Sequence, residues 1–255
     1  MSIKNVLSNA LKPGYFKVML DKVIKRLKEP QIEKNKLIAT EWCKSVGVDT
    51  AKYLSEKDKS LYDESYHFNE ELHQKSKPII EALPFKMGAG GNCILIYFLT
   101  KYYKPRTILE TGVSMGFSSK TFLTVIKEYG GSLYSSDFPY FRHANPEKYV
   151  GCIVPGELKS NWNLYIKGDR ENFKEILPKL DTIDLFHFDS DKSYEGRAFA
   201  FQAVLPYLNQ NSVVIFDDIN DNLHFKDLVN KYAAEYFVLT SPNGGYVGLI
   251  TKLKL

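Results

Sequence analysis

Apolar and polar positions follow a repeating pattern over the C-terminal two thirds of the chain. From about residue 86 onward, short apolar runs rich in Ile, Val and Phe are separated by stretches in which apolar residues recur at helical spacing. Apolar strands that alternate with helices are typical of a parallel sheet covered on both faces. The expected strands are Thr107–Glu110, Ser132–Ser136, Leu164–Lys167, Ile183–Phe188, Val213–Phe216, Tyr236–Leu239 and Tyr246–Thr251. The expected helices lie at residues 91–103, 116–129, 170–179, 194–207 and 222–234.

The last two expected strands are joined differently from the others. Only Ser-Pro-Asn-Gly-Gly, at residues 241–245, separates them, and its Asn-Gly step favours a tight hairpin turn. We therefore expect an α/β fold with a doubly wound, Rossmann-like sheet of seven strands, of which the last is antiparallel.

Residues 1–85 have a different pattern of apolar and polar residues. They contain few β-branched runs and read as helical segments at residues 14–28, 31–46 and 57–82. We expect a helical N-terminal extension over residues 1–85 and a Rossmann-like domain over residues 86–255. The extension is long enough to cover the domain, to form a homodimer contact and to supply part of a substrate pocket.

The net charge of +4 is unevenly distributed, because residues 1–40 contain nine Lys or Arg and only three Asp or Glu. Apolar residues between Phe16 and Leu27 recur at helical spacing among these basic residues, which predicts a basic amphipathic helix. Such a helix can bind an anionic membrane surface or an acidic partner, or it can pack on its own fold or on a second subunit. The rest of the chain is slightly acidic, so we expect no nucleic-acid binding.

Composition is that of an ordinary globular protein. The 255 residues are 44% hydrophobic and 25% charged, and a chain of this length buries a core without disulfides or structural metal. The longest apolar run, Cys93–Leu99, is far shorter than a membrane span. The three cysteines lie far apart in the sequence, which fits reduced thiols. We therefore expect a soluble, cytoplasmic protein.

Glycine and acidic residues are concentrated directly after the expected strands, where doubly wound sheets bind their ligands. Glu110, Gly112, Ser114 and Gly116 follow the first strand, and the two glycines permit a tight turn and a close backbone approach to a ligand. The turn departs from the dinucleotide pattern G-x-G-x-x-G, because Ser114 takes the middle glycine position. A purely structural turn is the alternative interpretation.

Further candidates follow the second and third strands. The carboxylate of Asp137, after the second strand, can accept both hydroxyls of a ribose or can simply belong to a turn. Gly168 and Asp169 follow the third strand. Asp169 can cap the next helix, contact a base or do both.

Three carboxylates follow the fourth and fifth strands, namely Asp189, Asp217 and Asp218. Neighbouring strand ends would bring them into one pocket, where they repel one another unless a cation or a proton neutralises them. Oxygen ligands of this kind suit a hard divalent cation, and we expect Mg²⁺. The alternative is that they cap helices at two separate turns. Lys192 is close enough in sequence to Asp189 to face the same pocket, where it could take a proton or hold an anionic oxygen.

Together these motifs resemble those of the class I S-adenosylmethionine-dependent methyltransferases. The resemblance covers about residues 86–255 and includes the terminal hairpin, which is a hallmark of that family. Glu110-x-Gly112-x-Ser114-x-Gly116 resembles the family's first motif, Asp137 its ribose-binding acid, and Gly168-Asp169 its adenine-side motif. Met87 and Gly88 lie where the family often has a loop that contacts the methionine end of the cofactor.

More narrowly, Asp189, Lys192 and the Asp217-Asp218 pair are similar to the metal-dependent O-methyltransferases of the catechol and caffeoyl-CoA type. The resemblance implies that Asp189, Asp217 and Asp218 bind the divalent ion, that Asp189 also borders the cofactor, and that Asp189 and Lys192 are catalytic, with Lys192 as the base. Residues 188–196 are also similar to a related bacterial group that acts on sugars and natural products, although that group usually carries His in place of Lys192. Asp218 stands where the catechol type has Asn, and Ser114 replaces a frequent glycine.

The sequence thus predicts an S-adenosylmethionine-dependent O-methyltransferase, assisted by Mg²⁺, that acts on a hydroxyl of a small molecule or a sugar. Two other functions share some of these features. An NAD-dependent oxidoreductase also uses a glycine turn and an acid after the second strand. A methyltransferase-like fold can also serve as a non-catalytic binding module.

Overall fold

The computed structural model describes residues 32–85, 91–139, 143–240 and 244–255. The expected basic helix at residues 14–28 and the candidate residues Met87 and Gly88 lie outside the described residues, as do residues 241–243 of the expected hairpin turn.

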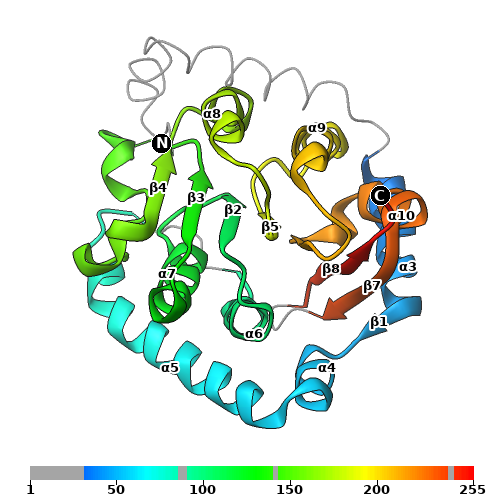
Figure 1. The fold of residues 1–255 in the computed structure, drawn as a ribbon, viewed down its shortest axis with the longest axis horizontal. Coiled ribbons are helices and arrows are strands. Elements are labelled where there is room, and N and C mark those ends of the chain that lie inside the picture. The colour runs from blue at the N-terminus through cyan, green and yellow to red at the C-terminus, as the bar shows by residue number, and fades with distance from the viewer. Residues whose placement is uncertain (1–31, 86–90, 140–142, 241–243) are drawn as a thin grey trace.

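The described residues form a single eight-stranded sheet with the order β1-β7-β8-β6-β5-β2-β3-β4 (Figure 1). Strand β8 runs antiparallel to its neighbours β6 and β7, and the other neighbouring strands are parallel. The strands are β1 (Gly47–Val48), β2 (Thr107–Thr111), β3 (Ser132–Ser136), β4 (Trp162–Tyr165), β5 (Leu185–Phe188), β6 (Val213–Phe216), β7 (Ala233–Thr240) and β8 (Tyr246–Leu253). The expected doubly wound sheet with an antiparallel last strand is confirmed, and β1 adds an eighth strand at its edge.

Helices cover both faces of this sheet (Figure 1). One face carries α4 (Thr50–Lys57), α6 (Cys93–Tyr103) and α7 (Phe117–Tyr129), with α5 (Lys59–Glu81) packed outside α6. The other face carries α3 (Ile32–Val46), α8 (Asp169–Ile176), α9 (Tyr194–Val204) and α10 (His224–Tyr232). Short 3-10 helices include η1 (Pro146–Tyr149), η2 (Gly156–Asn161), η3 (Leu177–Lys179), η4 (Leu205–Tyr207) and η5 (Ile219–Asp221).

The central strands are buried on both faces, which explains their continuous apolar sequences. Phe186 and Phe188 of β5 pack into the core beneath α8 to α10, whereas Leu185 packs into the core beneath α6 and α7. In β6, Val214 and Phe216 face the first of these cores, and Val213 and Ile215 face the second. This alternation follows from the two-residue period of a strand.

The ends of several elements differ from the expected ones for local reasons. Strand β4 begins at Trp162, because its pairing with β3 places Trp162 opposite Leu133. The expected helices 170–179 and 194–207 end as α-helices at Ile176 and Val204 and continue as η3 and η4. Both 3-10 segments contain a proline, which has no backbone N–H to donate to the carbonyl four residues earlier.

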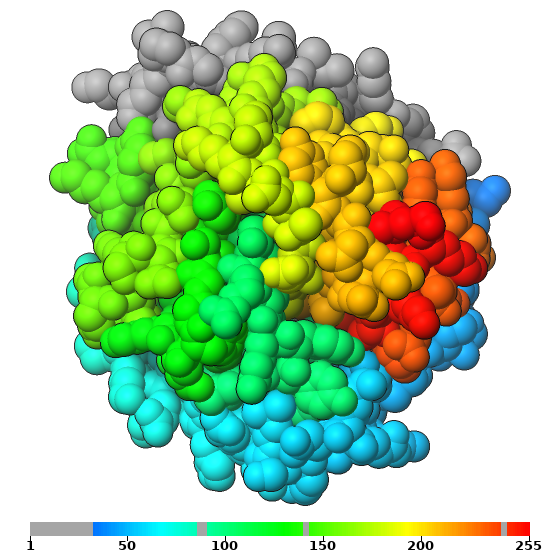
Figure 2. Space-filling model, in the orientation of Figure 1, coloured from blue at the N-terminus to red at the C-terminus, as the bar shows by residue number. Residues whose placement is uncertain are grey.

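The described part of the N-terminal extension packs on the domain over a wide area, as Figure 2 shows in blue and cyan. Helix α3 packs against η5, α5 packs against α6, and β1 pairs with β7. The sequence pattern missed β1 and α4, since a two-residue strand and an eight-residue helix are too short to show a period. The boundary at residue 85 stays a prediction. No helix among the described residues is long and apolar enough to cross a membrane.

Gly248 of β8 offers a test of how closely the sheet and α10 are packed. A Cβ atom at Gly248 would overlap the ring of Phe225, a fully buried residue of α10. We expect Gly248→Ala to lower the free energy of unfolding by about 2 kcal/mol through overpacking. Gly156→Ala is the matched control, because nothing lies within 4 Å of a Cβ at that position. Equal urea midpoints for the two variants would contradict the packing described here.

Candidate active site

The residues that follow β2, β3, β5 and β6 form a row at the carboxyl edge of the sheet. Gly112 N donates to Ser136 O at 2.8 Å, and Asp137 N donates to Tyr165 O at 2.9 Å. Asp189 N donates to Thr111 O and Asp217 N to Phe188 O, both at 3.0 Å. Each residue is thus fixed to the end of the neighbouring strand. The structure brings together the expected candidates that follow these four strands.

The turn after β2 requires glycine at two positions. Gly112 has a φ of 84°, and a Cβ atom there would overlap the carbonyl oxygen of Asp189. Gly116 has a φ of 99°, and a Cβ atom there would lie 2.9 Å from both Gly151 Cα and Val154 Cγ2. A side chain at either position would be strained and would push the turn away from its neighbours. The turn therefore crosses close over the end of β5.

Ser114 lies at the middle of this turn in the left-handed region, with a φ of 49°. Its backbone N donates to Asp137 Oδ2 at 2.8 Å, which ties the turn to the end of β3. Its Oγ is buried and has no hydrogen-bond partner among the described residues. Buried polar atoms in proteins nearly always have partners, so this hydroxyl marks a place where a ligand or water can bind.

Glu110 is fully buried beneath the turn rather than at its surface. Its carboxylate accepts hydrogen bonds from the hydroxyls of Ser118, Ser119 and Ser135. Burial raises the pKa of Glu110 to about 7, although the three hydroxyls oppose this shift. In this structure Glu110 supports the start of α7 from below, and a direct contact with a ligand stays a prediction.

Asp137 and Asp169 link the ends of neighbouring strands. Asp137 Oδ1 accepts from Phe138 N at 2.6 Å, and burial raises the pKa of Asp137 to about 6, with a smaller contribution from the charge of Asp169. Asp169 accepts from Ser136 Oγ at 2.6 Å and from Ser190 Oγ at 2.5 Å. Gly168, with a φ of 87°, is the N-cap residue of α8. Asp169 is therefore the first residue of α8 rather than its N-cap, which corrects the capping interpretation.

The three expected metal-binding carboxylates follow β5 and β6, and Lys192 lies beside two of them. Lys192 Nζ forms an ion pair with Asp189 Oδ1 at 3.1 Å and a second one with Asp218 Oδ2. Asp218 has a φ of 50°, in the left-handed region, directly after Asp217 at the end of β6. The side chain of Lys192 is 40% exposed, so it lies at the rim of the pocket rather than in bulk water.

Burial and nearby charges shift the pKa values of this cluster. Burial raises the pKa of Asp217 to about 8, and the charges of Asp189 and Asp218 act in the same direction. The pKa of Asp189 is raised by burial, although Lys192 opposes this effect. Burial acts to lower the pKa of Lys192, but Asp189 and Asp218 together outweigh it and raise the pKa above its usual value. Lys192 is therefore a stable ammonium in this arrangement.

The donor atoms of Asp189, Asp217 and Asp218 suit a divalent cation better than their arrangement does. Carboxylate oxygens are the donors that Mg²⁺ prefers, but the buried Asp189 Oδ1 already pairs with the ammonium of Lys192 at 3.1 Å. Within the described ranges, however, no three His, Cys, Asp or Glu side chains come together in a group that could hold a metal ion. The donor types fit a divalent cation, while the ammonium of Lys192 pairs with two of the three carboxylates.

Arg197 of α9 is a residue of this site that the sequence analysis missed. It is fully buried, and its Nη2 donates to Asp217 O at 3.0 Å and to Asp218 O at 2.9 Å. It therefore holds the turn that carries both carboxylates and supplies a positive charge beneath them. An arginine one turn into a helix gives no sequence signal for this role.

Gly91, just before α6, belongs to the same glycine-rich segment of the sequence as the candidate residues Met87 and Gly88. A Cβ atom at Gly91 would lie 2.8 Å from Asp217 Oδ2, so the segment before α6 approaches the acidic cluster closely. This contact places the chain that follows the candidate residues Met87 and Gly88 at the same edge of the sheet. The roles of Met87 and Gly88 themselves stay predictions.

Residues 109–219 match the family model of a methyltransferase domain. This part of the chain is therefore similar to a methyltransferase domain. The matched segment runs from β2 to η5. It includes the turn after β2, Asp137, Asp169 and the three carboxylates expected to bind a metal, Asp189, Asp217 and Asp218. No curated protein matches the sequence.

Several solved structures with a similar fold are described as O-methyltransferases. An O-methyltransferase from Bacillus cereus in complex with SAH has a TM-score of 0.52 and 16% identity, over 82% of this chain and 100% of that one. A candidate caffeoyl-CoA O-methyltransferase from Staphylococcus aureus has a TM-score of 0.53 and 15% identity, over 73% and 98% of the two chains. The O-methyltransferase TomG from Streptomyces achromogenes, in complex with SAM, has a TM-score of 0.50 and 16% identity, over 88% and 100%. The class I methyltransferase fold expected from the sequence is confirmed.

The buried carboxylate of Glu110 predicts a specific dependence of stability on pH. Its pKa is about 7 in the folded protein and 4.5 in an unfolded chain, so its stabilising contribution is complete below pH 4.5 and is lost as the pH rises through 7. We expect Glu110→Gln, which stays neutral, to gain stability relative to the wild type between pH 5 and pH 8.5. The expected gain is on the order of 2 kcal/mol, measured by urea unfolding.

Glu195→Gln is the control for this experiment, because Glu195 is exposed on α9. Its stability profile should stay parallel to that of the wild type. Parallel profiles for Glu110→Gln as well would contradict a buried charge at Glu110.

Proposed function

We propose that this protein is an S-adenosylmethionine-dependent O-methyltransferase, assisted by a divalent cation, that acts on a hydroxyl of a small molecule or a sugar. The observation that carries the proposal is the position of the acidic cluster. Asp189, at the end of β5, lies directly beneath the glycine turn, and its side chain pairs with Lys192 beside the turn after β6. A candidate donor site and a candidate acceptor site are thus adjacent.

The donor site consists of the glycine turn and the ends of β3 and β4. SAM or SAH is bound in two of the similar structures named above, which supports S-adenosylmethionine as the ligand here. The unpartnered Oγ of Ser114 and the close backbone approach at Gly112 provide a cradle for a polar ligand. Asp137 and Asp169, to which the sequence resemblance assigns the ribose and the adenine side, follow β3 and β4.

The acceptor site consists of the carboxylates after β5 and β6. A divalent cation held by Asp189, Asp217 and Asp218 would lower the pKa of the acceptor hydroxyl and orient its lone pair. Lys192 pairs with Asp189 and Asp218 in this structure, so a cation would compete with its ammonium for the same oxygens. Arg197 keeps the Asp217-Asp218 turn in place from below.

The protein's own contribution to methyl transfer is alignment and proton handling. Holding donor and acceptor in line can lower the barrier by roughly 7–11 kcal/mol. Lys192 Nζ, as an ammonium, can hold an anionic acceptor oxygen. It can accept the acceptor's proton only after it has lost its own, and otherwise a water molecule takes that proton.

Two observations oppose the alternative functions. An NAD-dependent oxidoreductase needs the G-x-G-x-x-G turn, and Ser114 interrupts that pattern here. A non-catalytic module would have no need for three carboxylates and a buried arginine at one strand edge, because buried charges of this kind reduce stability. The comparison with O-methyltransferase structures also favours the enzyme.

Chelation tests the role of the cation. We expect SAH release from S-adenosylmethionine, measured with catechols and methyl glycosides as acceptors, to be lost in EDTA and restored by Mg²⁺. Asp217→Asn should lower the rate by about a hundredfold or more, because it removes a charged ligand. Asp181→Asn is the control, since Asp181 is exposed and far from β6 in sequence. Turnover that EDTA leaves unchanged would refute the cation's role.

A further inference from the structure

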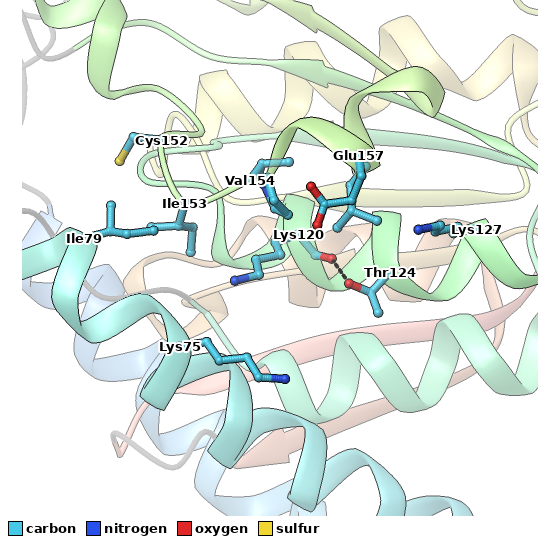
Figure 3. Close-up of a pocket in the computed structure, with 11 residues that line it drawn as sticks. Lys75, Ile79, Lys120, Thr124, Lys127, Cys152, Ile153, Val154 and Glu157 are labelled. Atoms are coloured by element: carbon cyan, nitrogen blue, oxygen red, sulfur yellow. Dashed lines mark hydrogen bonds between the residues drawn. The ribbon is translucent and has the colours of Figure 1, made fainter.

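A cavity of about 500 Å³ lies between α5, α7 and the segment that leads into η2 (Figure 3). Its volume is within the range of small-molecule sites. None of the carboxylates after β5 and β6 lines it, and neither does Lys192. The cavity is therefore separate from the candidate active site.

One side of this cavity is basic. Lys120, Thr124 and Lys127 line it from α7, and their spacing of four and seven residues places them on one face of that helix. Lys75 lines it from α5, and Figure 3 shows its side chain across from Lys120. Glu157 is the acidic residue of the lining. The lining thus carries more positive than negative charge.

Two of these lysines lack an ionic partner. Among the described residues, neither Lys120 nor Lys127 forms an ion pair, whereas Lys75 pairs with Glu71 at 2.6 Å. Within the described ranges, the hydrogen bond of Lys120 Nζ is a long one of 3.4 Å to Ser76 Oγ. Burial lowers the pKa of Lys120, and the nearby charge of Lys75 adds to this effect. An anion in the cavity would offset both the burial of the Lys120 ammonium and its repulsion by Lys75.

Apart from Glu157, the segment around η2 lines the cavity with apolar side chains. Ile153, Val154, Pro155 and Leu158 line it from the segment around η2, and Ile79 lines it from α5. Ile79 is 40% exposed, so part of this apolar surface is open to solvent. A ligand that fits both sides therefore has an anionic head and an apolar body.

The apolar side is connected to the glycine turn. Ile153 N donates to Met115 O at 3.1 Å, and Gly151 N donates to Ser114 O at 2.8 Å. Gly116 packs closely against Val154 and Gly151. A ligand in this cavity would therefore contact the segment that supports the turn from behind.

We propose that this cavity binds a small amphipathic anion in monomeric form. Its phosphate or carboxylate head contacts Lys75, Lys120 and Lys127, and its hydrocarbon body packs on Ile79, Ile153 and Val154. The proposal does not depend on the methyltransferase activity, because it rests on the cavity and its charges alone.

Calorimetric titration with octyl phosphate below its micellar concentration tests the proposal. We expect one site per chain, with an affinity that falls as the salt concentration rises. Lys120→Gln should weaken binding by about tenfold or more, since it removes a charged hydrogen-bond donor, whereas Lys120→Arg should restore it. Lys174→Gln, on the exposed surface of α8, is the matched control and should bind as the wild type does.

Thermal unfolding checks that each variant is folded. If Lys120→Gln does not fold, Lys127→Gln takes its place, because Lys127 is exposed. Octyltrimethylammonium and inorganic phosphate should bind much more weakly than octyl phosphate. The proposal is overturned if octyltrimethylammonium binds equally well, if inorganic phosphate does, or if Lys120→Gln leaves the affinity unchanged. It is also overturned if the protein sediments with phosphatidylglycerol vesicles but does not bind monomeric octyl phosphate.

Discussion

The hydrogen bonds that fix the residue after each parallel strand to the end of its neighbour determine the site. Through them Gly112, Asp137, Asp189 and Asp217 lie in one row, although more than 100 residues separate the first from the last. The glycine turn can cross over the end of β5 only because Gly112 has no Cβ atom to overlap Asp189 O. Everything proposed about donor and acceptor follows from this close approach.

The second constraint is the charge gathered at this edge. Asp137, Asp189 and Asp217 all have raised pKa values, chiefly because they are buried. Lys192 at the rim and Arg197 underneath balance part of this charge. A site that holds several partly buried carboxylates is costly to fold, and such arrangements are typical of functional sites. The positively charged side chains of Lys192 and Arg197 explain how these carboxylates are tolerated in the free protein.

The fold and the row of strand-end residues could be predicted from the sequence, because continuous apolar strands and glycine turns are local signals. The antiparallel last strand could also be predicted from a local signal, the Asn-Gly step between the last two strands. Strand β1 and helix α4 were missed because both are too short for a period, and α8 ended early because Pro178 stops the helix.

The sequence was less informative about what each side chain does. The pattern identified Glu110 as a candidate for ligand contact, but its three serine partners come from α7 and β3, and only the tertiary structure places them around it. The contact of Arg197 with the Asp217-Asp218 turn is likewise tertiary, and so is the cavity between α5, α7 and η2. Lys192 was expected in the same pocket as Asp189 and Asp218, and only the structure shows that it forms an ion pair with each of them.

The most direct measurement is a calorimetric titration of the purified protein with S-adenosylhomocysteine and, separately, with NADH. The account predicts one binding site per chain for S-adenosylhomocysteine, no binding of NADH, and an affinity for S-adenosylhomocysteine at least about tenfold lower in Gly112→Ala. Binding of NADH without binding of S-adenosylhomocysteine, or binding of neither, would contradict the assignment of this strand edge as a methyl-donor site.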